Sequence, residues 1–139
     1  MSKKRILIVD DDLACARILK AGLEQTRQYD VCTESRATHA LRVAREFTPD
    51  LVLLDVCMLD GDGGDVAFHL RRDERLRHVP IVFLTSIVSA EEAQNGNALR
   101  GAFHYLAKPV RLDRVIACIE NQIGSAEPDP QLSSERKST

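Results

Sequence analysis

The stretch Ile6-Leu7-Ile8-Val9-Asp10-Asp11-Asp12 places four consecutive aliphatic residues directly before three carboxylates. A second stretch repeats the arrangement, because Leu51-Val52-Leu53-Leu54 runs straight into Asp55. Short, continuous apolar runs of this kind are typical of strands that are buried on both faces of a parallel sheet. We therefore expect buried strands at residues 6–9 and 51–54, each ending in acidic residues.

Three further segments have the pattern of strands. Residues 81–84 (Ile-Val-Phe-Leu) and 102–106 (Ala-Phe-His-Tyr-Leu) are apolar runs, whereas residues 30–34 alternate apolar and polar side chains, as in a strand near a sheet edge. Between the strands, apolar residues recur with the period of an amphipathic helix. The helices are expected over residues 15–23, 37–47, 64–72, 90–99 and 112–123.

Strict alternation of strands and helices predicts βα units with right-handed crossovers. The expected fold class is α/β, with a single doubly wound five-stranded parallel sheet and helices on both faces. Residues 1–124 are predicted to form one domain. Residues 125–139 are polar and contain two prolines, so we expect a disordered tail or a linker.

Composition excludes several classes of function. The 139 residues are 44% hydrophobic and carry a net charge of -2, so no basic field is available to bind a nucleic acid. Charges interrupt every apolar run well before the ~20 residues of a membrane span. The four cysteines form no C-x-x-C pair, which argues against zinc and disulfides. We expect a cytoplasmic protein without direct nucleic-acid or membrane contacts.

Chemistry is expected at the carboxyl ends of the strands, because parallel α/β sheets bind ligands there. The residues at these ends are the acids Asp10, Asp11 and Asp55, the hydroxyl of Thr85 and the ammonium of Lys108. Crowded carboxylates repel one another, and Mg²⁺ is the cation best suited to stabilise them. An aspartate in such a site can attack phosphorus and form an acyl phosphate. Lys108 and Thr85 could then bind phosphoryl oxygens.

Several motifs occur together in a fixed order: Asp10-Asp11, Asp55, Asp62-Gly63, Thr85, Gly101-Ala102 and residues 105–109 (Tyr-Leu-Ala-Lys-Pro). With these motifs, the chain from Lys4 to about Ile123 resembles the receiver domains of two-component response regulators. The resemblance implies a (βα)5 flavodoxin-like fold. It also implies a phosphoprotein of phosphorelay signal transduction, with no enzymatic role beyond self-catalysed phosphoryl transfer and autodephosphorylation.

The resemblance further implies a role for each acid. Asp55 would be the phosphoacceptor. The Mg²⁺ ion would be bound by Asp11 directly, by Asp10 largely through water, by Asp55, and by the backbone carbonyl of Cys57.

The residues after the acids correspond to the switch of the family. Thr85 and Tyr105 match the pair that moves on phosphorylation, and Lys108 matches the lysine that contacts the phosphoryl group. We expect Lys108 and Thr85 to act after phosphorylation rather than in folding. The peptide bond that corresponds to Lys108-Pro109 is usually cis in the family. Proline permits this because it lowers the free-energy cost of the cis form.

The same resemblance implies the partners. A sensor histidine kinase or a phosphotransfer protein would supply the phosphoryl group, and relatives recognise it with the first helix and the loop after the last strand. The output would be a protein target or a second copy of the chain, bound through the face made by residues 90–99, 102–106 and 112–123. The chain would be either a stand-alone receiver or a piece of a longer regulator.

The loop after Asp55 departs from the family, because Leu59 stands where proline is most common. Without the fixed φ of proline, and with Gly61, Gly63 and Gly64 nearby, we expect this loop to be more mobile. The neighbouring Asp60 and Asp62, like Asp12 earlier in the chain, are expected to be caps, turn residues or solvated charges.

Two alternatives stay open. A Mg²⁺-dependent phosphohydrolase with an aspartyl nucleophile would use the same acids, but such enzymes have a second aspartate two positions later, where this chain has Cys57. A phosphorylation-independent interaction module is the other alternative. A dinucleotide-binding site is excluded, because no G-x-G-x-x-G motif follows the first strand.

Overall fold

The computed structural model describes residues 3–86, 99–100 and 103–124. The strands are β1 (Lys4–Val9), β2 (Tyr29–Glu34), β3 (Leu51–Asp55), β4 (Cys57–Met58), β5 (Gly61–Asp62), β6 (Ile81–Thr85), β7 (Leu99–Arg100) and β8 (Phe103–Ala107). The helices are α1 (Leu13–Gln25), the 3-10 helix η1 (Ala37–His39), α2 (Ala40–Phe47), α3 (Gly63–Arg72) and α5 (Leu112–Ile123). None of these helices has the length and apolar character needed to cross a membrane.

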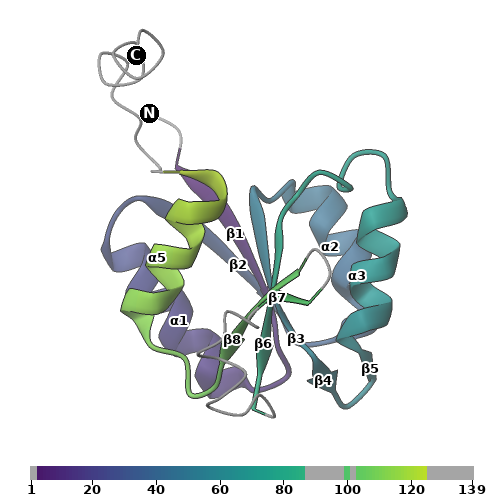
Figure 1. Ribbon diagram of the computed structural model, residues 1–139, viewed down its shortest axis with the longest axis horizontal. Helices are drawn as coiled ribbons and strands as arrows, with labels where there is room; N and C mark the ends of the chain where they lie inside the picture. The colour runs from purple at the N-terminus through teal and green to yellow at the C-terminus, as the bar shows by residue number, and fades with distance from the viewer. Residues whose placement is uncertain (1–2, 87–98, 101–102, 125–139) are drawn as a thin grey trace, which may run out of the picture.

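The main sheet has the strand order β2-β1-β3-β6-β8-β7 (Figure 1). The first five of these strands pair parallel with one another, which confirms the predicted five-stranded parallel sheet. The short strand β7 was not predicted, and it pairs antiparallel with β8. The helix expected over residues 90–99 therefore does not include Leu99, and residues 90–98 lie outside the described part of the chain.

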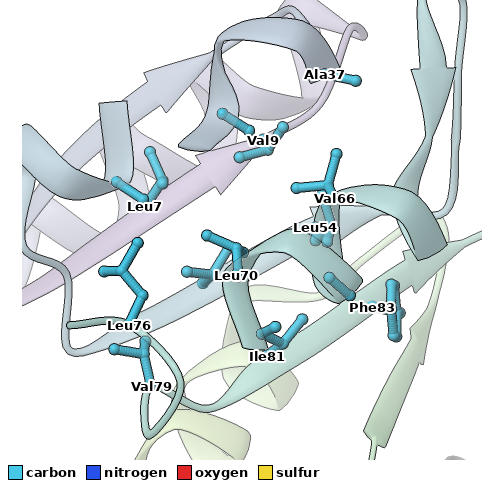
Figure 2. Packing of buried hydrophobic residues seen from close by; sticks show 14 of the residues in the cluster. Leu7, Val9, Ala37, Leu54, Val66, Leu70, Leu76, Val79, Ile81 and Phe83 are labelled. Atoms are coloured by element: carbon cyan, nitrogen blue, oxygen red, sulfur yellow. The ribbon is translucent and has the colours of Figure 1, made fainter. Parts of the chain in front are cut away.

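Helices cover both faces of the sheet, as predicted, with α1 and α5 on one side and α2 and α3 on the other (Figure 1). Side chains of β1 alternate between these faces because successive Cβ atoms of a strand point in opposite directions. Leu7 and Val9 join the α2/α3 core, which Figure 2 shows packed around Leu70 of α3. Ile6 and Ile8 join the α1/α5 core. All residues of β3 and β6 are buried.

The sheet order brings the acidic strand ends together. Strands β1 and β3 are direct neighbours, and Val9 of β1 is paired with Leu54 of β3. The connection after β1 leads to α1 on one face, whereas the connection after β3 leads to α3 on the other. Such a reversal leaves a crevice at the carboxyl ends of two adjacent strands. Asp10 and Asp55 are the residues at this position.

Two of the neighbouring aspartates begin helices, as the sequence predicted. The Asp12 side chain accepts a hydrogen bond from the Cys15 N–H at the start of α1. The Asp62 side chain accepts one from the Gly64 N–H at the start of α3. Each such cap typically stabilises a helix by about 1 kcal/mol.

Gly63 begins α3 where the chain passes closest to the end of β3. A Cβ atom at this position would collide with the Asp55 carbonyl oxygen and would lie 2.9 Å from the Val56 Cα. We expect Gly63→Ala to destabilise the fold by roughly 1–3 kcal/mol, or about 4–10 °C in a thermal melt.

Gly64→Ala is the matched control, because its added Cβ would meet only the flexible Asp62 side chain, at 3.3 Å. Alanine also favours a helix by about 1 kcal/mol over glycine. Equal melting temperatures for the two variants would contradict the close approach at Gly63.

Candidate functional site

Three carboxylates converge at the ends of β1 and β3. Asp10 is fully buried, Asp55 is 5% exposed and Asp11 is half-buried. One carboxylate oxygen from each of these residues lies within 4.8 Å of the other two. The Asp12 N–H donates to Asp10 Oδ1 over 2.9 Å, so the start of α1 also orients the buried carboxylate. The structure thus brings together the three acids that the sequence predicted to meet.

Lys108 lies beside these acids. Its Nζ is 2.8 Å from Asp10 Oδ2 and 3.4 Å from Asp55 Oδ2. The Lys108 N–H donates to the Thr85 carbonyl oxygen over 2.8 Å, and the Lys108-Pro109 bond is cis, as expected. Burial by itself lowers the pKa of Lys108, but its hydrogen bond to Asp10 and the two acidic charges raise the pKa overall.

This pairing bears on the prediction that Lys108 acts after phosphorylation rather than in folding. In the structure, the ammonium already neutralises part of a buried acidic cluster. Breaking a buried ion pair leaves an uncompensated charge and is strongly destabilising. We therefore expect Lys108 to stabilise the unphosphorylated protein as well, while its action after phosphorylation stays a prediction.

The pKa of Asp55 is raised well above its ordinary value. Burial, followed by the charge of Asp10, raises the pKa of Asp55 to about 6. The Cys57 N–H donates to Asp55 Oδ1 over 3.3 Å and opposes this shift. The buried environment and the negative charge of Asp10 thus favour the protonated form of Asp55, and a nearby cation would favour the ionised form.

Thr85 and Tyr105, the predicted switch pair, lie on adjacent strands. Thr85 is 5% exposed at the end of β6, where it is paired with Ala107 of β8. Tyr105 stacks on Phe83, with ring centroids 5.1 Å apart. Because residues two apart on a strand share a face, the stacked rings and Thr85 lie on the same side of the sheet. Tyr105 therefore lies two residue pairs along the strands from Thr85.

The segment after Asp55 forms the small hairpin β4–β5 rather than an irregular loop. The Leu59 N–H donates to Asp11 Oδ2 over 2.7 Å. The Asp60 carboxylate accepts hydrogen bonds from the N–H groups of Ala37 and Thr38 and from the Thr38 hydroxyl. Asp60 is therefore a turn residue, as predicted. These hydrogen bonds connect the turn to η1 and to Asp11, and the greater mobility expected of this loop stays a prediction.

The donor set fits a hard divalent cation. Three carboxylates face a single lysine, so the cluster keeps an excess of negative charge in a largely buried position. Carboxylate oxygens are the ligands that Mg²⁺ prefers. A bound Mg²⁺ would neutralise this excess. Cys57 lies beside the cluster with an exposed side chain, and its backbone carbonyl stays a predicted ligand.

Comparison with known proteins identifies relatives along most of the chain. The family model "Response regulator receiver domain" matches residues 6–120. The chain is 30% identical over 126 residues to the polar-differentiation response regulator DivK of Brucella ovis, covering 88% of this chain and 98% of DivK. It is 32% identical over 129 residues to the transcriptional regulator RpaA of Synechocystis, covering 93% of this chain but only 53% of RpaA.

Solved structures give the same result. The chemotaxis response regulator CheY4 of Vibrio cholerae matches with a TM-score of 0.74 and 26% identity, over 88% of this chain and 100% of that one. The receiver domain of the sensor histidine kinase PA1611 of Pseudomonas aeruginosa matches with a TM-score of 0.74 and 27% identity, over 89% and 100%. That structure has a magnesium ion coordinated in its active-site cleft. Together with the acidic cluster and the strand order, these matches show that the chain belongs to the response regulator receiver domain family.

Proposed function

We propose that Asp55 is the phosphoacceptor of this receiver domain. The observation that carries the proposal is the convergence of the buried Asp55 carboxylate with Asp10, Asp11 and Lys108. An Asp55 oxygen attacks the phosphorus of a phosphohistidine, the P–N bond breaks, and an acyl phosphate forms while the imidazole leaves. The Lys108 ammonium, 3.4 Å from Asp55 Oδ2, is placed to pair with the new phosphoryl oxygens. The chain would have no further enzymatic role than this transfer and the hydrolysis of the acyl phosphate, in which water takes the phosphoryl group as inorganic phosphate and the Asp55 carboxylate is restored.

The cofactor of this reaction would be Mg²⁺. Asp10, Asp11, Asp55 and the backbone carbonyl of Cys57 would hold it, and the magnesium ion in the PA1611 receiver domain supports this assignment. When bound, the ion supplies charge neutralisation for the phosphoryl oxygens. Asp11 is the most accessible of the three acids, which suits a direct ligand that exchanges with solvent.

The phosphoryl donor would be a sensor histidine kinase or a phosphotransfer protein. A groove of about 440 Å³ lies between α1 and the segment after β8, and Lys108 lines it. Its wall includes Ile18, which is 72% exposed, and Leu13 on the same helix is 55% exposed. Exposed aliphatic side chains on α1, next to a groove that Lys108 lines, suit a protein partner that must deliver a phosphohistidine to Asp55.

The output would be a change in protein binding. Phosphorylation replaces the single negative charge of the Asp55 carboxylate with a phosphoryl group of charge about -1.5 to -2 beside Thr85 and Lys108, which favours arrangements that bring donors inward. Tyr105 would relay the change to the face of residues 90–99, 102–106 and 112–123, where a protein target or a second copy binds. We place this activity in the cytoplasm, in a domain spanning residues 1–124. The chain spans about half the length of RpaA, so any activity of a longer protein is a further proposal.

Phosphorylation by acetyl phosphate tests the central assignment. Incubation with acetyl phosphate and Mg²⁺ should add one phosphoryl group to the parent protein, measured by intact mass. Asp55→Asn should prevent the addition, because the amide is not a nucleophile toward phosphorus. Omitting Mg²⁺, or replacing Asp11 with alanine, should slow it at least ~100-fold.

Asp65→Asn is the matched control for this experiment, since Asp65 is an exposed acid on α3 and is not one of the three clustered acids. It should still be labelled. Labelling of Asp55→Asn at the parental rate would overturn the assignment.

Removal of Lys108 should destabilise the protein when no cation is present. Lys108→Ala leaves the fully buried Asp10 without its ion pair, at a cost of about 3 kcal/mol or more. Thermal melts in EDTA should show the loss, and Mg²⁺ should restore part of it by replacing the missing positive charge. Arg111→Ala is the control, because its pairing with Asp113 is exposed and contributes little. Equal melts for the two variants in EDTA would refute the stabilising role of Lys108.

The raised pKa of Asp55 predicts a pH-dependent stability. The unfolded chain ionises Asp55 near its ordinary pKa of 3.8, whereas the folded protein keeps the proton up to about pH 6. Asp55 therefore lowers the free energy of unfolding as pH rises through this window, and its unfavourable contribution is full above about pH 6. In EDTA, Asp55→Asn should be more stable than the parent by on the order of 1–3 kcal/mol at pH 7.5.

Urea denaturation of both proteins at pH 7.5 and near pH 4 measures this difference. The gap between them should shrink toward acid pH. A gap that is constant with pH would show that burial does not raise the pKa of Asp55.

A further inference from the structure

The turn at Leu59 and Asp60 connects β4 to β5 with two residues, because Met58 is paired with Gly61. Neither Leu59 nor Asp60 has a positive φ. Two-residue hairpin loops favour turn types with at least one positive φ, because those types match the twist of the strands. This turn is therefore not of the types that two-residue hairpins favour, and contacts from outside the hairpin can help to fix it.

Such contacts exist on both sides of the turn. On one side, the Leu59 N–H donates to Asp11 Oδ2 over 2.7 Å. On the other side, Asp60 Oδ1 accepts from the Ala37 N–H over 2.8 Å, and Asp60 Oδ2 accepts from the Thr38 hydroxyl over 3.1 Å. The turn also packs closely on η1, since a Cβ atom added to Gly61 would lie 2.9 Å from the Ala37 Cβ.

We propose that this turn is a positioning device for Asp11: the Leu59 N–H orients the Asp11 carboxylate for a divalent cation, and Asp60 fixes that N–H by anchoring the turn to η1. The proposal rests on the proposed function in one respect, namely that Asp11 is a Mg²⁺ ligand. Leu59 and Asp60 themselves would not contact the ion.

The physical reason is the freedom of the Asp11 side chain. Asp11 is half-buried, and the Leu59 N–H is the hydrogen-bond donor that the structure places on its Oδ2. Partners that orient a metal-binding carboxylate typically change metal affinity by about 10- to 100-fold. A proline at position 59 would have no N–H to donate. Hydrogen bonds from Ala37 and Thr38 also lower the pKa of Asp60, so its anchoring charge persists at neutral pH.

Leu59→Pro tests the role of the N–H. Leu59 has no positive φ, which proline could not adopt, and it follows an extended strand, the conformation that residues before a proline favour. We expect the Kd for Mg²⁺, measured by calorimetric titration of the whole chain, to rise by about 10-fold. Leu59→Ala is the matched control: it keeps the N–H and removes only a side chain that is 97% exposed, so its Kd should stay within about twofold of the parent.

Asp60→Ala tests the anchor. It should raise the Kd for Mg²⁺ several-fold, and Asp60→Asn should recover part of the affinity, because its carbonyl oxygen can still accept from the Ala37 N–H. A purely structural role would lower the melting temperature and leave the Kd unchanged. That result would overturn the anchoring role of Asp60.

Amide hydrogen exchange of the metal-free protein separates this inference from the proposed metal site. The Leu59 amide should exchange slowly in the parent and rapidly in Asp11→Ala, whether or not Asp11 binds a cation. An unprotected Leu59 amide in the parent would overturn the inference. These amide measurements and the Asp60 variants also decide the question if Leu59→Pro fails to fold.

The titrations have two further outcomes. If Asp11→Ala abolishes Mg²⁺ binding while Leu59→Pro stays within about twofold of the parent, the metal site stands and the positioning role is refuted. If the parent binds no Mg²⁺ that depends on Asp11, the proposed metal site fails and the inference fails with it.

Discussion

Mutual repulsion of three carboxylates is the constraint on which the rest of this structure depends. Asp10, Asp11 and Asp55 present oxygens within 4.8 Å of one another, and Asp10 is fully buried. Isolated buried charges of one sign are strongly unfavourable. The fold offsets them with the Lys108 ammonium and with N–H groups from the start of α1 and from the β4–β5 hairpin. The same unfavourable arrangement creates the demand for a cation on which the proposed chemistry relies.

The hydrophobic core makes this arrangement possible. Strands β3 and β6 are buried on both faces, and β1 sends side chains into both cores. Rigid packing of this kind fixes the strand ends, so the carboxylates cannot relieve their repulsion by moving apart. The free energy gained by burying aliphatic residues thus supports a site that is unfavourable by itself.

Much of the fold and the site could be predicted from the sequence, because continuous apolar runs report buried strands and strand ends report ligand sites. Asp12 and Asp62 were also predictable as caps, because a cap acts on the N–H groups two or three residues later. The hydrogen bonds of the hairpin turn were not predictable. The Leu59 N–H and the Asp11 carboxylate are 48 residues apart, and Asp60 lies more than 20 residues from Ala37 and Thr38. The pattern of neighbouring residues in the sequence does not predict hydrogen bonds between residues so far apart in the chain.

The ion pairs of Lys108 with Asp10 and Asp55 were likewise not predictable from local sequence. The position of Lys108 at a strand end predicted only a contact with a phosphoryl group. Its pairing with Asp10 depends on two strands that are separated in the sheet by β3 and β6. The end of the helix predicted over residues 90–99 was wrong for a different reason. Leucine is common in both helices and strands, so the sequence around Leu99 does not distinguish between them. The backbone pairing of Leu99 with His104 of β8 makes it part of a strand.

The sheet also acts as a partition between two cores that share few side chains. The α1/α5 core and the α2/α3 core each draw on alternate residues of the same strands. Substitutions that share no partners have nearly additive effects on stability. A substitution on α3 that alters stability therefore does not require a compensating substitution on α1. Such a layout lets the outer surfaces diverge through evolution, each at its own pace, while the chemistry at the strand ends is preserved.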